Sequence, residues 1–283
     1  NLIGIYNPLC KSFGYSIRNK MITGIIGCGN IGTELALFMD KRKDFELKYL
    51  FDIDKDNSDN LTKKLKNSNP KFASFDSLIK NSELTIESAN KEAVKKILKN
   101  KNLDKGNKKL LVMSTSGLFE NISSLKKTKN CDIYLPSGAI AGLDAIKSVS
   151  GKISSLTLTT TKNPKGIANA PFILKNNINL KKIKNKKIIF QGKLKEAVVG
   201  FPKNINVAAT LFLASKFNNI KIKIIADPKT KTNTHEIVCK GNFGNLTLIA
   251  ENLPSKNPKT SYLAILSAIQ VLKNINNKVK IGS

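Results

Sequence analysis

The segment ITGIIGCGNIG, residues 22–32, decides the fold. Its first half is a short apolar run typical of a buried strand, and from Asn30 onward the apolar spacing indicates an amphipathic helix. The turn between them has the pattern G-x-G-x-x-G, with glycines at 27, 29 and 32. Such glycines permit a tight turn, close approach of the backbone to a pyrophosphate, and close packing of helix on strand. This combination predicts a dinucleotide-binding unit of the Rossmann type.

Asp52 ends the next predicted strand, which begins at Leu47. An acidic side chain at this place accepts hydrogen bonds from the adenosine ribose hydroxyls. Because a carboxylate repels a 2′-phosphate, Asp52 favours NAD, although the nearby Lys55 leaves NADP possible. Phosphates bind at helix N-termini, and ligands bind at the carboxyl ends of parallel strands. The predicted cofactor contacts are therefore Gly27, Gly29, Asn30, Ile31, Gly32, Asp52, Ala89 and Ser114.

Short β-rich runs alternate with helical segments in the first half of the chain. The predicted strands are 22–27, 47–52, 71–76, 83–88, 109–114 and 131–136, and the predicted helices are 30–41, 57–67, 90–100 and 117–127. This alternation is typical of an α/β fold with a doubly wound parallel sheet. We expect it to form a Rossmann-type domain of residues 21–135.

The pattern changes beyond residue 135. Apolar and polar residues alternate in predicted strands at 154–161, 186–192, 220–228, 234–240 and 245–251, and helices are predicted at 201–217 and 260–275. Strict alternation indicates one wet and one dry sheet face, as in antiparallel or mixed sheets. We expect a second, smaller α+β domain at 136–259. The C-terminal segment 260–283 is expected to return its helix to the first domain.

Residues 1–20 precede Met21 and lack the basic start and continuous apolar run of a secretory signal. They are expected to be a disordered leader or an upstream extension. No stretch approaches the ~20 consecutive apolar residues that span a bilayer, so no membrane association is expected. Four cysteines stand far apart, which argues against a structural zinc site or any other metal site and favours a reducing, cytoplasmic setting.

The formal net charge of +28 raises the possibility of a nucleic-acid partner. Arg18 and Arg42 are the only arginines, however, and arginine is the usual side chain for bidentate recognition of bases and phosphates. The lysines are spread along the whole chain beside abundant Asn and Ile. All three residues have A/T-rich codons, so a compositional bias of the genome explains the charge. The composition therefore argues against a nucleic-acid partner.

His235 is the only histidine, and it lies among polar residues at the junction of two alternating strands. A dehydrogenase acting on a C–OH or C–NH₂ carbon needs a proton donor or acceptor, a role that histidine suits at neutral pH. The alternative is a histidine on the surface or satisfied within the core.

Four segments of the second half resemble those of L-aspartate dehydrogenases, a family of NAD(P)-dependent enzymes. They are PSGAIAGLDA (136–145), GFPKNINVAATLFLA (200–214), DPKTKTNTHEI (227–237) and NLPSKNPKTSYLAILS (252–267). The resemblance runs from Met21 to Ile275, and it does not include residues 1–20 or the heavy lysine content.

The resemblance implies oxidative deamination of L-aspartate to iminoaspartate, then oxaloacetate and ammonia, feeding NAD biosynthesis through quinolinate. It implies that His235 is the active-site histidine, that Ala139 and Asn206 contact the cofactor near its nicotinamide, and that the enzyme is a homodimer. A dicarboxylate also needs cationic and hydroxyl donors, which Lys259, Thr260 and Ser261 supply at a helix start. Thr260 or Ser261 as a helix cap is the compatible alternative. Asn233 either orients His235 or holds a tight turn.

Two alternatives remain at this point. One is another Rossmann oxidoreductase, of the homoserine dehydrogenase or dihydrodipicolinate reductase type. The other is a basic protein that binds nucleic acid and keeps NAD only as a sensed ligand.

Overall fold

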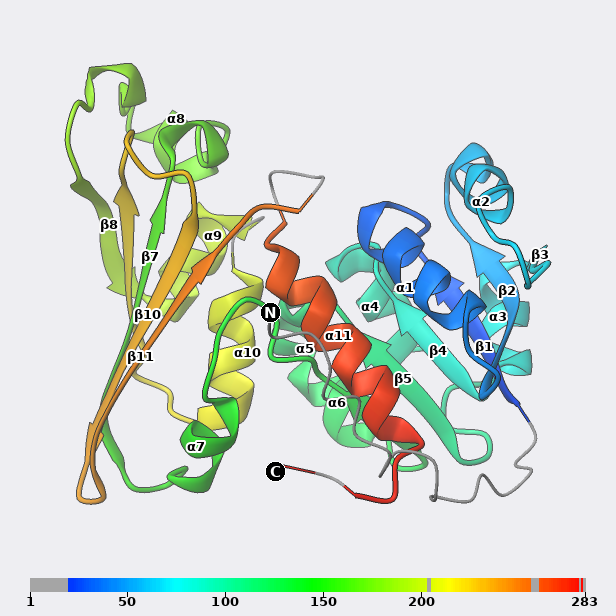
Figure 1. The fold of residues 1–283 in the computed structure, drawn as a ribbon. Helices are drawn as coiled ribbons and strands as arrows, with labels where there is room; N and C mark the ends of the chain where they lie inside the picture. Colours follow the sequence, from blue (N-terminus) through cyan, green and yellow to red (C-terminus); the bar gives the residue numbers. More distant parts are fainter. Residues whose placement is uncertain (1–19, 203–204, 256–259, 280, 282–283) are drawn as a thin grey trace, which may run out of the picture.

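The protein contains two β-sheets with helices packed on them, joined by contacts between helices (Figure 1). The computed structural model describes residues 20–202, 205–255, 260–279 and 281. The expected leader therefore lies almost wholly outside the described residues.

The first sheet is parallel throughout, with the strand order β3-β2-β1-β4-β5-β6. This is the order of a doubly wound dinucleotide-binding fold, so the predicted fold class is confirmed. Its strands are β1 Met21–Ile26, β2 Phe45–Phe51, β3 Lys71–Phe72, β4 Leu84–Glu87, β5 Lys108–Val112 and β6 Cys131–Tyr134. The connecting helices are α1 Asn30–Asp40, α2 Lys55–Thr62, α3 Phe75–Asn81, α4 Lys91–Leu98, α5 Thr115–Glu120 and α6 Ile122–Lys127.

Both faces of this sheet are buried, which explains the continuous apolar runs of its strands. Ile25 points into a core formed with α1 and α2, whereas the next residue, Ile26, points into a core formed with α3, α4 and α5. Neighbouring residues of a strand point to opposite faces, so a strand covered on both sides can bury apolar side chains at successive positions.

The predicted strand at 71–76 is wrong after its second residue. Ser74 caps a helix instead, because its hydroxyl accepts a hydrogen bond from Ser77 N at 3.3 Å. Leu78 and Ile79 of that helix are fully buried. The predicted helix at 117–127 is divided in two at Asn121, whose side chain bonds back to the Gly117 carbonyl at 2.8 Å.

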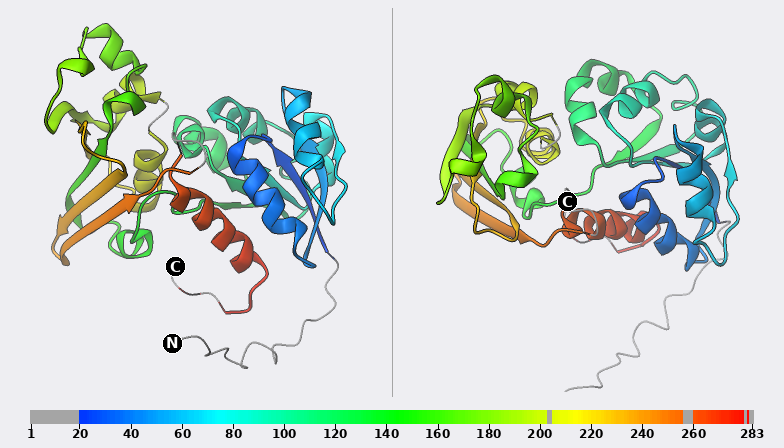
Figure 2. Two further views of the ribbon diagram at one scale, coloured as in Figure 1. Left: turned by 45° about the horizontal axis from the view of Figure 1, so that its top comes forward. Right: turned by 90° about the horizontal axis from the view of Figure 1, so that it is seen from above.

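The second sheet is mixed, with the order β11-β10-β7-β9-β8 and only β7 and β9 parallel to each other. Its strands are β7 Ile153–Lys162, β8 Lys187–Lys193, β9 Lys221–Ala226, β10 Asn233–Gly241 and β11 Gly244–Asn252. The helices α7 Leu143–Ser148, α8 Pro171–Lys175, α9 Leu194–Gly200 and α10 Asn206–Ser215 cover one face. The other face carries no helix of the described chain (Figure 2).

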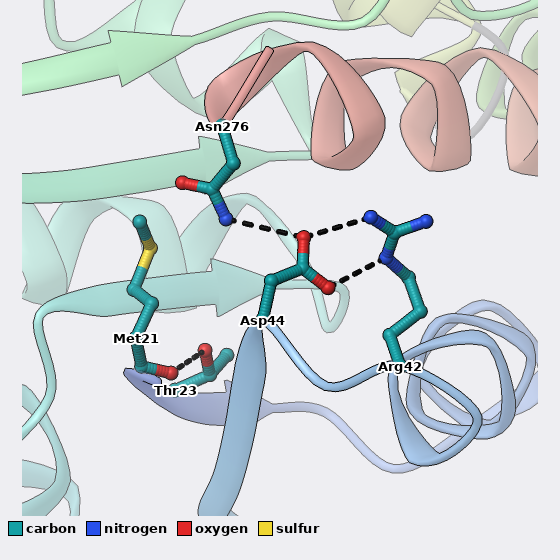
Figure 3. Close-up of polar contacts among 5 residues, drawn as sticks. All are labelled: Met21, Thr23, Arg42, Asp44 and Asn276. Carbon is teal, nitrogen blue, oxygen red and sulfur yellow. Dashed lines mark hydrogen bonds and ion pairs between the residues drawn. The ribbon is translucent and has the colours of Figure 1, made fainter. Parts of the chain in front are cut away.

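Helix α11, Tyr262–Ile275, lies along the first sheet although it follows the second in sequence (Figure 1). Ala268 and Leu272 are fully buried in the core that contains α1. The end of the helix is held by Asp44, which pairs with Arg42 Nε at 2.7 Å and Nη2 at 2.8 Å and accepts a hydrogen bond from Asn276 Nδ2 at 3.3 Å. Figure 3 shows Asp44 between these two donors, and beside it the Thr23 hydroxyl bonded to the Met21 carbonyl.

Helices α5 and α10 join the two halves. Asn206 Oδ1 accepts from Ser116 N at 3.2 Å, and its carbonyl accepts from the Thr115 hydroxyl at 2.8 Å. The rings of Phe119 and Phe212 meet edge to face, with centroids 4.9 Å apart. Because these contacts begin at the carboxyl end of β5, they bring the second half beside the edge where a parallel sheet binds ligands.

Candidate active site

Two of the three glycines of the turn, Gly27 and Gly32, are required by its shape. Gly27 has φ +96°, and a Cβ there would lie 2.7 Å from the backbone nitrogen of Ala89. A Cβ on Gly32 would collide with the Gly27 carbonyl oxygen. A Cβ on Gly29, by contrast, would meet no atom within 4 Å. Only the middle glycine therefore faces open space, which is where the pattern expects pyrophosphate.

A cavity of about 830 Å³ opens at this turn. Its walls come from the glycine turn, the end of β2, the start of α3 and the length of α4. They include Gly27, Gly29, Asp52, Ile53, Ala89 and Lys96. The Ile53 side chain is 90% exposed, an apolar surface beside Asp52 that suits an adenine ring. Lys55 does not line this cavity, and its Nζ lies over the Phe72 ring, 5.9 Å from the ring centre.

The two oxygens of Asp52 are both anchored. Oδ2 accepts from Cys28 N at 2.7 Å, and Oδ1 accepts from Asp54 N at 3.0 Å. The carboxylate is thus tied to the glycine turn while remaining on the cavity wall. An acidic side chain in this position is typical of a site that accepts hydrogen bonds from a ribose. The cavity residues therefore fit a pyridine dinucleotide.

Glu87, at one of the strand ends expected to line the cofactor crevice, is a fully buried carboxyl. Oε1 accepts from Ala89 N at 2.8 Å and from the Ser114 hydroxyl at 2.9 Å, and Oε2 accepts from Ser114 N at 2.9 Å. Burial raises the pKa of Glu87 to about 7, although these donors oppose the shift. Glu87 therefore fixes both strand ends at which Ala89 and Ser114 were predicted to meet the cofactor. The sequence indicates Glu87 because it is an acidic residue at the end of a predicted apolar strand.

The other two residues of the glycine segment point in different directions. Asn30 donates from Nδ2 to the Ser255 hydroxyl at 3.2 Å, which brings the end of the second sheet to the start of α1. The Ile31 side chain packs against the core of the first sheet.

His235 lies on β10 and is 4% exposed. Its Nδ1 is 3.0 Å from the Thr160 hydroxyl of the neighbouring strand β7. Burial, and next the charge of Lys162, lower the pKa of His235 to about 3, so the imidazole is neutral at physiological pH. The Thr-rich segment 154–161 was predicted to be a strand. The sequence did not indicate which of its threonines would hydrogen-bond to His235.

Asn252 joins the segments around His235, a role that was not predicted from the sequence. Its Nδ2 donates to the carbonyls of Ala139 at 3.0 Å, Asn233 at 3.1 Å and Ala250 at 3.2 Å. The predicted residues Ala139 and Asn233 are thereby brought together through their backbones. Thr160 rather than Asn233 bonds the Nδ1 atom of His235.

Two of the three residues predicted to bind substrate at the start of α11, Thr260 and Ser261, lie within the described residues. Ser261 occupies the N-cap position of α11 and is buried, but its side chain makes no capping hydrogen bond. The carbonyl of Thr260 accepts from Ser255 N at 2.7 Å, so this segment lies next to the residue that contacts Asn30. Lys259 lies outside the described residues.

Residues 144–275 match the family model described as "Aspartate dehydrogenase, C-terminal", and residues 27–136 match "Homoserine dehydrogenase, NAD binding domain". An L-aspartate dehydrogenase of Methanococcoides burtonii is 41% identical over 92% of this chain and 98% of its own length. The corresponding protein of Nitrosopumilus maritimus is 40% identical with the same coverage. The chain belongs to the aspartate dehydrogenase family.

Solved structures agree with this membership. The crystal structure of aspartate dehydrogenase from Thermotoga maritima has a TM-score of 0.71 and 27% identity, over 93% of this chain and 100% of that one. A myo-inositol dehydrogenase of Lactobacillus casei, with 10% identity and a TM-score of 0.52 over 84% and 76% of the two chains, shares the fold alone. No helix in the described part of this aspartate dehydrogenase family member is long and apolar enough to cross a membrane.

Proposed function

We propose that the chain is an L-aspartate dehydrogenase that oxidatively deaminates L-aspartate. The observation that carries this proposal is the match to L-aspartate dehydrogenases over 92% of the chain, with the one histidine buried at the end of the second sheet. The family model that matches the second half is specific to aspartate dehydrogenases, so the homoserine description of the first half concerns its dinucleotide-binding fold.

In the proposed reaction, L-aspartate gives up a proton from its nitrogen and a hydride from its α-carbon, forming iminoaspartate. A bound pyridine dinucleotide supplies the acceptor for the hydride. Water then adds to the C=N carbon, and loss of ammonia leaves oxaloacetate. The released iminoaspartate also suits quinolinate formation, which we propose as its use in NAD biosynthesis.

His235 is proposed to move the proton in the hydrolytic step. Its neutral imidazole takes a proton from the water that attacks the imine carbon and returns it to the departing nitrogen. Thr160 orients the ring through Nδ1, which leaves Nε2 for this exchange. Ala139 and Asn206 are proposed to contact the nicotinamide half of the cofactor, and Asn233, Lys259, Thr260 and Ser261 the substrate.

Replacing His235 tests this proposal. Wild-type protein should oxidise NADH with oxaloacetate and ammonia, and His235→Ala should lose about 10²–10⁴-fold in kcat. NADH binding, measured by fluorescence titration, should be nearly unchanged because the dinucleotide cavity lies on the first sheet. Loss of both turnover and NADH binding would make His235 a structural residue.

L-homoserine is the matched control substrate, because the first half also matches a homoserine dehydrogenase model. Turnover of homoserine without turnover of aspartate by the wild-type protein would overturn the proposed function.

NAD is proposed as the preferred cofactor, with NADP possible, since Asp52 stands on the cavity wall and Lys55 does not. We also propose a cytoplasmic setting, which the free thiols of Cys28, Cys131 and Cys239 support. The high net charge is again attributed to composition rather than to a nucleic-acid partner.

We propose the domain division 21–135, 136–259 and 260–283, supported by one sheet with its own core in each of the first two segments. A homodimer is proposed to form through the outer face of the second sheet. That face includes Val238, Thr247 and Ile249, and no described helix covers it (Figure 2).

A further inference from the structure

Lys162, the last residue of β7, is a buried lysine. It is 9% exposed, and no other lysine among the described residues falls in the buried class. Burial lowers the pKa of its ammonium group to about 8. Removing an ammonium group from water is costly, and lysine is among the residue types least often buried. A lysine held in such a place is therefore a candidate for a functional role.

The strand register places Lys162 beside His235. Thr160 and Lys162 are two residues apart on β7, so their side chains share one face of the sheet. Thr160 is the register partner of His235 on β10 and bonds its ring. Lys162 therefore lies on the same sheet face as His235, and its charge contributes to lowering the pKa of His235.

The acidic residues of the neighbouring strands lie on the opposite face. Glu236 follows His235 directly, and Glu251 precedes the inward-facing Asn252, so strand alternation turns both carboxylates outward. Glu251 is accordingly exposed. The inner face at this end therefore combines a lysine, a neutral histidine and a threonine, a set that is complementary to an anion.

We propose that Lys162 is a substrate-binding residue whose ammonium group binds a carboxylate of the substrate next to His235. This inference rests on the proposed function, which supplies a dicarboxylic amino acid. A desolvated ammonium–carboxylate contact is a strong hydrogen bond and holds the substrate at the histidine. It also neutralises the cation beside His235, which raises the pKa of the imidazole when substrate is bound and makes it a better proton acceptor.

The test uses succinate, a dicarboxylate that has no amine to oxidise. Succinate is titrated calorimetrically into NADH-loaded wild type, Lys162→Met, Lys162→Arg and the control Lys223→Met, a half-buried lysine on the outer face of β9. We expect about 10–100-fold weaker binding to Lys162→Met, the usual loss for a hydrogen bond to a charged group. Lys162→Arg should recover most of the affinity, and Lys223→Met should match wild type.

KM for oxaloacetate should rise by a similar factor in Lys162→Met while the Kd for NADH stays unchanged. A change below fivefold in both succinate affinity and KM would overturn the role of Lys162. If Lys162→Met does not fold, failure of the folded Lys162→Arg to retain succinate within tenfold of wild type overturns it instead. Wild-type protein that neither turns over aspartate nor binds succinate would overturn the proposed function itself, a result distinct from the first.

Discussion

Asp52 shows how one carboxylate serves both the fold and the proposed cofactor preference. Its oxygens hold Cys28 N and Asp54 N, so they fix the glycine turn relative to the end of β2. The same negative charge faces the cavity. A residue that kept the turn but lacked the charge would therefore separate the two roles.

We expect Asp52→Asn to lower kcat/KM for NAD relative to NADP by about tenfold, since a charged acceptor for the ribose contributes roughly 1.5–3 kcal/mol. The ratio is obtained from initial rates with both cofactors at saturating aspartate. Asp56→Asn removes the same charge from the exposed start of α2 and should leave the ratio unchanged. An unaltered ratio in Asp52→Asn would remove the ribose assignment.

Helix α11 is the element whose position depends most on distant parts of the chain. Its buried Ala268 and Leu272 pack beside α1, and its end is held by Asp44 between Arg42 and Asn276 (Figure 3). The Arg42 pair is bidentate, the stronger form of such contacts. These contacts connect the C-terminal helix to the loop before β2.

Asp44→Ala should destabilise the protein by about 1–2 kcal/mol, because two donors lose a charged acceptor that is only partly screened by solvent. Urea unfolding measures the loss, and hydrogen exchange should show faster exchange in the last turn of α11. Glu46→Ala is the control, since its ion pair with Lys48 is exposed and 3.5 Å long, and its effect should stay below about 0.5 kcal/mol. Equal effects of the two changes would contradict the proposed anchoring.

At the scale of the whole molecule, the second sheet has one face that no helix of the described residues covers. The outer face of the second sheet carries Ile249, 58% exposed, next to its register partner Glu236 on β10. An uncovered sheet face with apolar residues is a typical place for two copies of a chain to associate.

Light scattering after size exclusion should give about twice the chain mass of 31.1 kDa for wild type. Ile249→Lys should shift the protein toward the monomer, because it places a charge on the apolar part of the proposed interface. Val199→Lys, at an apolar side chain 76% exposed on α9, is the matched control and should leave the mass unchanged. A monomeric wild type would rule out the proposed homodimer.

Local sequence patterns determined the glycine turn and the two kinds of β-sheet in this protein. A glycine turn between a buried strand and a helix admits few geometries, so the turn at Gly27 and Asp52 at the end of β2 were predictable. Strand periodicity likewise predicted the change from a sheet buried on both faces to one buried on a single face. It failed at residues 73–76, where the cap formed by Ser74 prevails over an apolar run too short to distinguish strand from helix.

Only the tertiary structure decided which distant residues meet. His235 and Thr160 are 75 positions apart, Asn252 and Ala139 113, and Asn276 and Asp44 232. No local pattern encodes such pairs, because strand order and register are set by the packing of the whole chain. The burial that makes His235 neutral and places Lys162 beside it arises from that same packing, so the charge state of the site is a property of the fold rather than of the sequence motif.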